Sequence, residues 1–259
     1  MRRGVIIAVF LMAAATTASA QFVAPGGAVP VVANLPGLNN TDWRTDVSIV
    51  NLADTETSVL MLLQPEIADG EPAFEPVLSE PVSIAAGEQR TLRNIVEAFF
   101  GMSNTKGALS VFTNDGAPLV ISARIYTLDD DGGSYGQNVE GVLVANTAWA
   151  AGIAHDDFYR TNFGIYLPFD PPVGQTTRFV VNAFDRDGEQ VGTANVYFTA
   201  AGVQQRSLNA LGVQGLLDGY LEIRCLDPSV AFYAYASRVD QVSGDAVFRQ
   251  AKGRQSDLP

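Results

Sequence analysis

Apolar and polar residues alternate along much of this chain. Within residues 219–225, the apolar residues Leu221, Ile223 and Cys225 are separated by single residues, most of them polar. Residues 119–126 follow the same two-residue period. A period of two is that of a β-strand with one buried face. These segments therefore predict strands.

Turn sequences interrupt the alternating runs at regular intervals, as at Asn114-Asp115-Gly116 and Asp187-Gly188. Turns of this kind join antiparallel strands, whereas parallel strands need long crossovers. Residues 94–100 predict two helical turns, closed by Gly101 in the left-handed conformation. Their counterpart at 209–212 is shorter. We therefore expect antiparallel sheets with very little helix.

Segments of the first half of the chain recur, in the same order, in the second half. Residues 43–49 (WRTDVSI) match residues 159–165 (YRTNFGI), and residues 107–111 (GALSV) match residues 219–223 (GYLEI). The same offset, within a few residues, relates AGEQRTL to AGVQQRSL and ARI to SRV. A preserved order at a nearly constant offset indicates a duplicated unit of domain size.

Each copy is long enough for about seven or eight short strands, and the single cysteine excludes an internal disulfide. We therefore expect an all-β protein made of two tandem Ig-like antiparallel β-sandwich domains, each with one short helix. A small barrel is the alternative. The expected domains cover residues 21–145 and 146–259. The proline-rich and acidic segment 65–81 predicts an exposed irregular edge.

The N-terminus has the pattern of a secretory signal peptide. Arg2 and Arg3 precede an apolar run over residues 5–15, and Ala18-Ser19-Ala20 offers the small residues needed for cleavage. The apolar run is too short to cross a hydrocarbon layer of about 30 Å. We expect residues 1–20 to be removed after Ala20, leaving a secreted protein, periplasmic or extracellular, with no membrane insertion.

The charge balance narrows the class of partner. The chain carries 16 basic and 28 acidic residues, for a net charge of −12. Nucleic-acid binding needs clustered cations, which this balance disfavours. An apolar content of 47% predicts a folded core. Protein or polysaccharide of the cell envelope is the expected partner.

Catalytic chemistry finds little support. His155 is the single histidine, which excludes any site that needs two imidazoles. We interpret His155 as a loop residue bonded to nearby backbone, and Cys225 as a buried, inert thiol. We expect no enzyme. A hydrolase with a pair of carboxylates stays open as a lesser alternative, because the separation of such a pair is set by tertiary structure.

Two acidic loops are weak candidates for calcium. Asp129, Asp130 and Asp131 precede two glycines, and Asp185 and Asp187 flank a basic residue. Calcium requires six to eight oxygen ligands, and neither loop has the twelve-residue spacing of an EF-hand. Aspartate-rich turns are the alternative explanation. No other cofactor is expected.

Tyr233 and Tyr235 fall on one face of one predicted strand. Their flat rings could stack on sugars as a ligand surface, with ordinary cross-strand packing as the alternative. Three arginines occupy repeated positions in both copies, which favours structural hydrogen bonds from sheet to loop. The pairs are Arg44 and Arg160, Arg90 and Arg206, and Arg124 and Arg238.

The repeated motifs resemble a known kind of module. Trp43-Arg44-Thr45-Asp46, then the AGEQRTL segment, then Ala123-Arg124-Ile125 look like the tandem Ig-like β-sandwich modules of largely undefined function in secreted bacterial proteins. The resemblance implies fold and export but no reaction. We expect a secreted, non-catalytic binding or adhesion module that recognises protein or polysaccharide. A passive structural spacer is the alternative.

Overall fold

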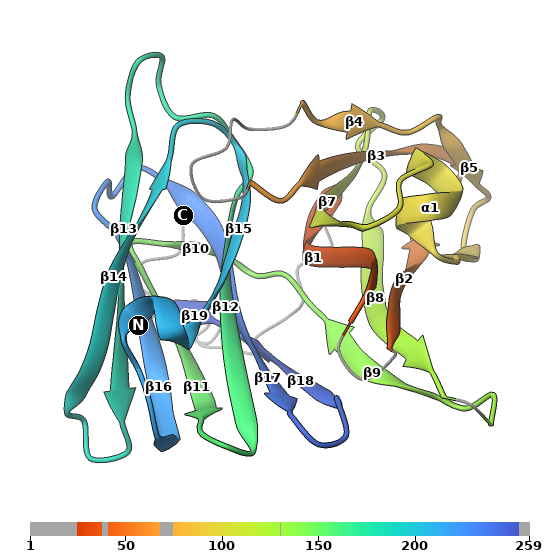
Figure 1. Cartoon of the computed structure of the whole chain (residues 1–259). Coiled ribbons are helices and arrows are strands. Elements are labelled where there is room, and N and C mark those ends of the chain that lie inside the picture. The colour runs from red at the N-terminus through yellow and green to blue at the C-terminus, as the bar shows by residue number, and fades with distance from the viewer. Residues whose placement is uncertain (1–24, 38–40, 68–74, 130, 254–259) are drawn as a thin grey trace, which may run out of the picture.

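The computed structural model describes residues 25–37, 41–67, 75–129 and 131–253 (Figure 1). Antiparallel strands account for most of these residues, and the two helical segments are each at most six residues long. The all-β prediction is confirmed. The predicted signal peptide, residues 1–20, lies outside the described residues.

The first half, residues 25–139, contains two layers of strands. Sheet 1 consists of β2 (Asp42–Asn51), β6 (Gln89–Leu92), β8 (Leu119–Leu128) and β9 (Ser134–Val139). Sheet 2 consists of β1 (Gly26–Pro36), β3 (Thr57–Pro65), β4 (Val77–Leu78), β5 (Val82–Ile84) and β7 (Thr105–Thr113). The end of β1 also pairs with β2, so the two layers join along one edge into a nine-stranded sheet.

The second half, residues 143–253, contains two separate five-stranded sheets. Sheet 3 consists of β10 (Leu143–Ala145), β12 (Tyr159–Leu167), β15 (Gly202–Ser207), β17 (Ala231–Asp240) and β18 (Ala246–Gln250). Sheet 4 consists of β11 (Thr147–His155), β13 (Thr177–Asp185), β14 (Gln190–Phe198), β16 (Leu216–Cys225) and β19 (Lys252–Gly253). Residues 143–145 were assigned to the first domain from sequence, but they pair with β17 of the second half.

Strand pairing repeats between the halves. In sheet 1, β2 lies between β6 and β8, and in sheet 3, β12 lies between β15 and β17. The helix α1 (Ile95–Phe100) ends at Gly101 with φ 64°, and the 3-10 helix η1 (Leu208–Leu211) ends at Gly212 with φ 78°. Both predicted helical segments are present. Each ends at its glycine because glycine adopts the left-handed conformation without steric cost.

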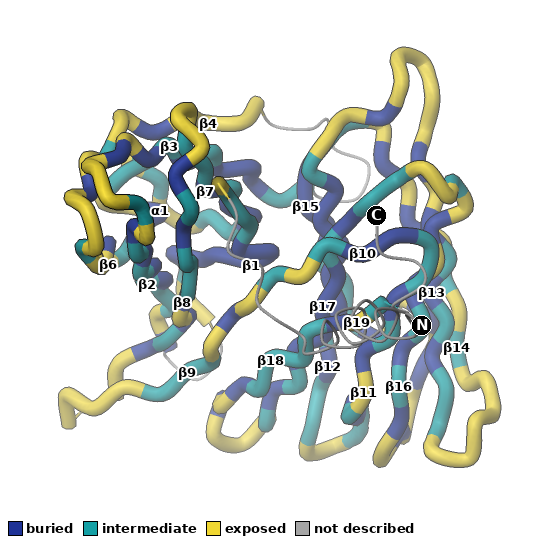
Figure 2. Tube along the Cα trace, turned by 180° about the vertical axis from the view of Figure 1, so that it is seen from behind, coloured by how far each residue is buried: buried dark blue, intermediate teal, exposed yellow. Residues whose placement is uncertain are grey.

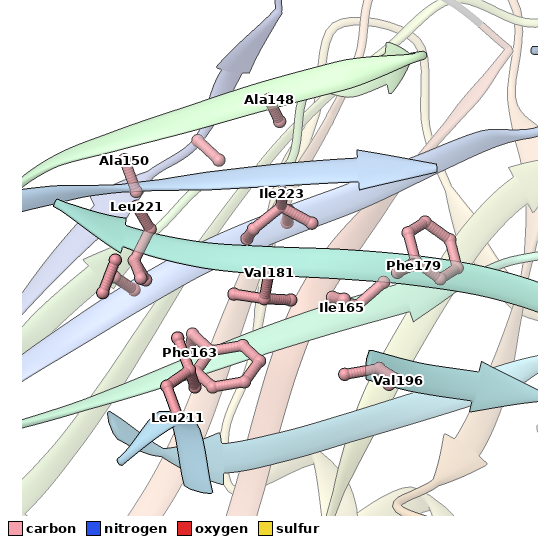
Figure 3. Close-up of a cluster of buried hydrophobic side chains, with 14 of the residues drawn as sticks. Ala148, Ala150, Phe163, Ile165, Phe179, Val181, Val196, Leu211, Leu221 and Ile223 are labelled. Carbon is pink, nitrogen blue, oxygen red and sulfur yellow. The ribbon is translucent and has the colours of Figure 1, made fainter. Parts of the chain in front are cut away.

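Each half has its own buried core. In the second half, the core lies between sheets 3 and 4 (Figure 3), where the Phe179 ring makes edge contacts with Phe198 and Phe232 at centroid distances of 5.6 and 4.9 Å. Leu221 and Ile223 are completely buried there, as the alternation predicted. This burial fixes which side of sheet 4 faces inward.

The two halves meet through the outer faces of sheets 2 and 3. Ala108 on β7, Tyr166 on β12 and Val203 on β15 form a third buried cluster between them. Figure 2 shows buried positions continuing along β1 and β7 and along β15 and β17, where the halves come together. Sheet 3 thus packs on the first half, against sheet 2 and, through β18, also against β9 of sheet 1.

Candidate binding groove

The face of sheet 3 that meets the first half comes from alternate residues of β12. Tyr166 pairs with Tyr233 and Val203, and Gly164 pairs with Tyr235 and Gln205. Further along the strand, Asn162 pairs with Ser237 and Arg160 pairs with Val239. Residues directly opposite on neighbouring strands point to the same side of a sheet. One face therefore runs from tyrosines at one end to an arginine at the other.

At the tyrosine end, the two halves are joined by a buried polar contact. The Tyr166 hydroxyl donates to Oε1 of Gln64 and lies 2.8 Å from Oγ of Ser110, both in the first half. Gln64 is 3% exposed. Burial raises the pKa of Tyr166 to about 12. Its hydroxyl therefore stays protonated as a donor throughout the physiological pH range.

A charged group that contacts both halves lies beside the contact of Tyr166 with Gln64. Oε1 of Glu66 is 3.0 Å from Nζ of Lys106 and accepts a hydrogen bond of 3.1 Å from the Gln205 backbone N–H. The backbone N–H of Ile67 donates to the Val203 carbonyl oxygen. Residues 66 and 67 belong to the proline-rich segment that was expected to be an exposed edge. These two residues instead lie along the edge strand β15 and join the first half to it.

The structure decides between the two alternatives for Tyr235 in favour of ordinary packing. Its side chain is 1% exposed, its ring stacks on Phe248 at 5.3 Å, and its hydroxyl donates to Oε1 of Gln205 at 2.8 Å. Burial raises its pKa. Tyr233 is half-buried and stacks on Tyr166. The two rings do share one face, but that face is covered by the first half rather than open to a sugar.

Beyond the tyrosines, a groove of about 400 Å³ lies between sheet 3 and the first half, where strands of both sheet 1 and sheet 2 line it. Both halves line it. The first half contributes a mainly apolar wall, which includes Val31, Ala33, Leu35, Trp43 and Ile125. The second half contributes a more polar wall, which includes Arg160, Asn162, Gln205, Tyr235 and Ser237. A volume of several hundred Å³ with one apolar side and a few convergent polar groups is typical of small-ligand sites.

Arg160 is the unusual residue of this groove. Among the described residues, no hydrogen-bond acceptor or carboxylate partners its guanidinium, and its Nε atom is buried without a hydrogen bond. Burial lowers the pKa of Arg160, although an arginine stays charged at neutral pH. Arg160 is half-buried, and a cation that is partly removed from water without a counter-charge is costly. The site therefore favours any anion that can enter.

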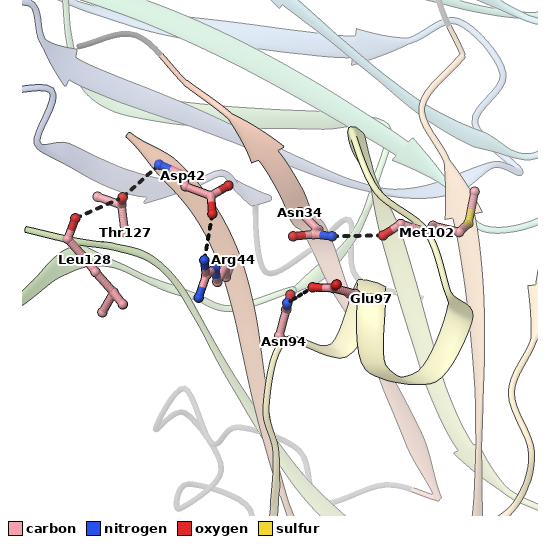
Figure 4. A network of polar contacts seen from close by, with 8 residues as sticks. All are labelled: Asn34, Asp42, Arg44, Asn94, Glu97, Met102, Thr127 and Leu128. Carbon is pink, nitrogen blue, oxygen red and sulfur yellow. Dashed lines mark hydrogen bonds and ion pairs between the residues drawn. The ribbon is translucent and has the colours of Figure 1, made fainter. Parts of the chain in front are cut away.

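The first half supplies an internal comparison, because Arg44 occupies the position equivalent to Arg160. The Nη2 atom of Arg44 lies 2.7 Å from Oδ2 of Asp42 (Figure 4), and this bond raises the pKa of Arg44. At the position equivalent to Asp42, the second half has Phe158, which is 65% exposed. The second copy therefore lacks the carboxylate that neutralises the arginine in the first copy.

Asp46 shows the same replacement. It accepts a hydrogen bond from Tyr126 and lies near Arg93 in the first half, whereas its equivalent is the neutral Asn162. Sequence reasoning treated the repeated arginines as one structural class and so missed Arg160. The signal was present in the aligned segments, DWRTD against FYRTN, where both acids that flank the arginine disappear together.

The other repeated arginines do make structural bonds. Arg90 donates to the Ser83 carbonyl oxygen at 2.6 Å, and Arg124 donates to Ser134 at 3.1 and 3.2 Å. Arg206 donates to Gln204, and Arg238 lies 5.0 Å from the centre of the Tyr159 ring. Ser83 belongs to β5 and Ser134 to β9, so Arg90 and Arg124 tie strand to strand rather than sheet to loop as expected from sequence.

The two aspartate loops have the same hairpin geometry. Oδ1 of Asp129 accepts from the backbone N–H groups of Asp131 and Gly133, and Oδ1 of Asp185 accepts from those of Asp187 and Glu189. Asp130 lies outside the described residues. Among the described residues, in these loops and in the rest of the chain, no three histidine, cysteine or acidic side chains are grouped so that they could hold a metal ion. Calcium binding stays a prediction.

The remaining candidates have ordinary surroundings. Nδ1 of His155 accepts from the Thr161 backbone N–H at 3.3 Å, and its Nε2 lies 2.8 Å from Oδ1 of Asn209. This agrees with a histidine that fixes local structure. Cys225 is 5% exposed in the second core, and burial raises its pKa. A buried thiol with a raised pKa is a poor nucleophile.

No protein-family model and no curated protein sequence matches this chain. Within the described residues, neither helical segment is long and apolar enough to cross a bilayer. The groove and its chemistry are therefore the basis for a functional proposal.

Proposed function

We propose that this protein is a secreted, non-catalytic binding module. Its two halves are interpreted as tandem Ig-like β-sandwiches, and the groove between them is the binding site. The observation that carries the proposal is the groove itself, whose walls come from both halves and which ends at the buried contacts of Tyr166 and Tyr235. A ligand that spans the groove contacts both halves at once.

Several features support binding over catalysis. The groove has no histidine or cysteine among its lining residues. His155 is engaged by Thr161 and Asn209, and Cys225 lies in the core. The signal-peptide pattern supports export, and the cell envelope is then the natural source of the ligand, whether protein or polysaccharide.

Co-sedimentation with insoluble polysaccharides and purified cell envelopes tests this function. We expect saturable retention on one material. An Asn162→Trp variant fills the groove from the middle of β12, and we expect it to lose retention. Ser122→Trp places the same ring on β8, on the outer face of sheet 1, and should leave retention unchanged.

The competing role is that of a passive spacer. It predicts no saturable retention on any material, or equal retention of both tryptophan variants. Either result would refute the groove as the functional site.

A further inference from the structure

We infer that the group of the envelope ligand that enters the groove is a single carboxylate on an apolar body, and that this carboxylate pairs with Arg160. This inference rests on the proposed function and names the class of ligand for the same groove. It rests on three observations: a missing counter-charge, the shape and polarity of the walls, and the charge of the whole chain.

The missing counter-charge identifies the polar end of the ligand. In the first half, the equivalent arginine is satisfied by Asp42, a carboxylate two residues earlier on the same strand. In the second half, Phe158 and Asn162 replace both flanking acids, and Arg160 is left without a partner among the described residues. A guanidinium presents a planar fork that fits a carboxylate through two parallel hydrogen bonds. A carboxylate supplied by a ligand restores the pairing that the first copy makes internally.

The neighbours of Arg160 keep this site selective for one anionic group. Lys106 also lines the groove, but its ammonium group is already paired with Glu66 at 3.0 Å. Asn162 and Ser237, which are cross-strand neighbours beside Arg160, are neutral hydrogen-bonding groups. The uncompensated charge facing the ligand is therefore that of Arg160.

The opposite wall identifies the rest of the ligand. It presents Val31, Ala33 and Leu35 of β1 together with Trp43 of β2. Burial of an apolar ligand surface against such side chains is favourable by about 25 cal/mol per Å². Trp43 is braced by an edge contact with Tyr135 at a centroid distance of 6.3 Å. A rigid ring or a short aliphatic chain fits this wall better than a highly hydroxylated group.

The net charge argues against a polyanion. The chain carries −12 at neutral pH, so its long-range field repels a ligand with many negative charges. A single carboxylate meets little of this repulsion and gains the local attraction of Arg160. Polyuronates and nucleic acids are thereby disfavoured relative to a monoanion.

The test compares cyclohexanecarboxylate with its neutral isostere, cyclohexanecarboxamide, by isothermal titration calorimetry on the purified protein. We expect the acid to bind saturably and the amide to bind at least about 10-fold more weakly, since a charge-assisted pair is lost. Fluorescence of Trp43 offers a second readout, because the chain has only two tryptophans. Both probes lack absorbance that would interfere with that readout.

Three variants locate the effect. Arg160→Gln should weaken binding of the acid by about 10- to 100-fold and leave the amide unchanged. Phe158→Asp gives Arg160 a carboxylate partner within the chain, so it should also weaken binding of the acid. Because position 158 is exposed, this variant keeps the test valid where Arg160→Gln fails to fold. Arg44→Gln removes the equivalent arginine of the first half and should change nothing.

Equal affinity for acid and amide, or an unchanged affinity in both Arg160→Gln and Phe158→Asp, would overturn the inference. Absence of any binding by the acid would overturn it as well. These failures are distinguishable from failure of the proposed function, because Asn162→Trp can still abolish envelope retention when the ligand is not a carboxylate.

Discussion

Gly164 lies on the face of sheet 3 that meets the first half, and it has no room for a side chain. Its neighbour across the sheet is Tyr235, whose ring covers the glycine so closely that an added Cβ would overlap the ring carbons. Gly164→Ala therefore forces the ring to move. The ring has little freedom, because it is 1% exposed, stacks on Phe248 and bonds to Gln205.

The cost can be worked out from these contacts. Overpacking a rigid interior by one methyl group costs about 1–3 kcal/mol. Displacement of the ring also loses its hydrogen bond to Gln205, worth about 1 kcal/mol. We therefore expect Gly164→Ala to lower the free energy of unfolding by about 2–4 kcal/mol. For a chain of this size, the corresponding drop in Tm is about 5–15 °C.

Urea and thermal denaturation followed by circular dichroism measure this loss. Ser48→Ala is the matched control, because Ser48 occupies the equivalent position in the first half, on the outer face of sheet 1. It should change the unfolding free energy by no more than about 0.5 kcal/mol beyond its bond to Thr91. A double variant with Tyr235→Leu should recover part of the loss. A Gly164→Ala protein as stable as the Ser48→Ala protein would refute the close packing of the two halves at this point.

Three further predictions concern the interface and the loops. Tyr166→Phe leaves the buried Gln64 without its hydroxyl donor, so it should lower the free energy of unfolding by about 1–3 kcal/mol in the same urea titration, and no change would contradict the buried contact. The Thr57 hydroxyl donates to Asp115 and lowers its pKa, so the stabilisation it gives is present above about pH 4 and is lost as pH falls through the lower folded-state pKa. Asp115→Asn should therefore flatten the acid side of a plot of Tm against pH, and a profile that keeps its slope would contradict this. In the two aspartate loops, Oδ1 of Asp129 and of Asp185 already accepts backbone hydrogen bonds, so we expect a Tm that does not respond to millimolar calcium or to EDTA, and a rise of Tm with calcium would show a bound ion.

Much of the local structure could be predicted from sequence because one physical signal dominates it. Alternation placed Leu221 and Ile223 in the core, since side chains of a strand point alternately to its two faces. The positive φ at Gly101 followed from the freedom of glycine at a helix end. These features depend on neighbours in the chain and are visible in a short window.

The contact between the halves could not be predicted in this way. Alternation separates the two faces of a strand, but it does not say whether the face away from the core meets solvent or another sheet. Asp46 and Asn162 occupy equivalent outer faces, yet the first lies on the outer side of sheet 1 and the second in the groove. Alternation therefore could not choose between a ligand surface and ordinary packing for Tyr235. Only the stacking of sheets 2 and 3, which is tertiary, decides the outcome.

Duplication gives the molecule two versions of one sheet face with different roles. In the first half, the face around Arg44 is internally neutralised by Asp42. In the second half, the acids are lost and the same face is covered at the tyrosine end and hollow at the arginine end. The absence of an internal partner is what distinguishes Arg160 from Arg44.

A crystal structure of the protein soaked with 4-bromobenzoate tests the central claim most directly, because the bromine is located by its anomalous scattering. The account predicts a bromine peak against the apolar wall near Trp43, with the carboxylate paired to the Arg160 guanidinium. A bromine peak outside the groove, or an Arg160 already bonded to a carboxylate of its own chain, would contradict it.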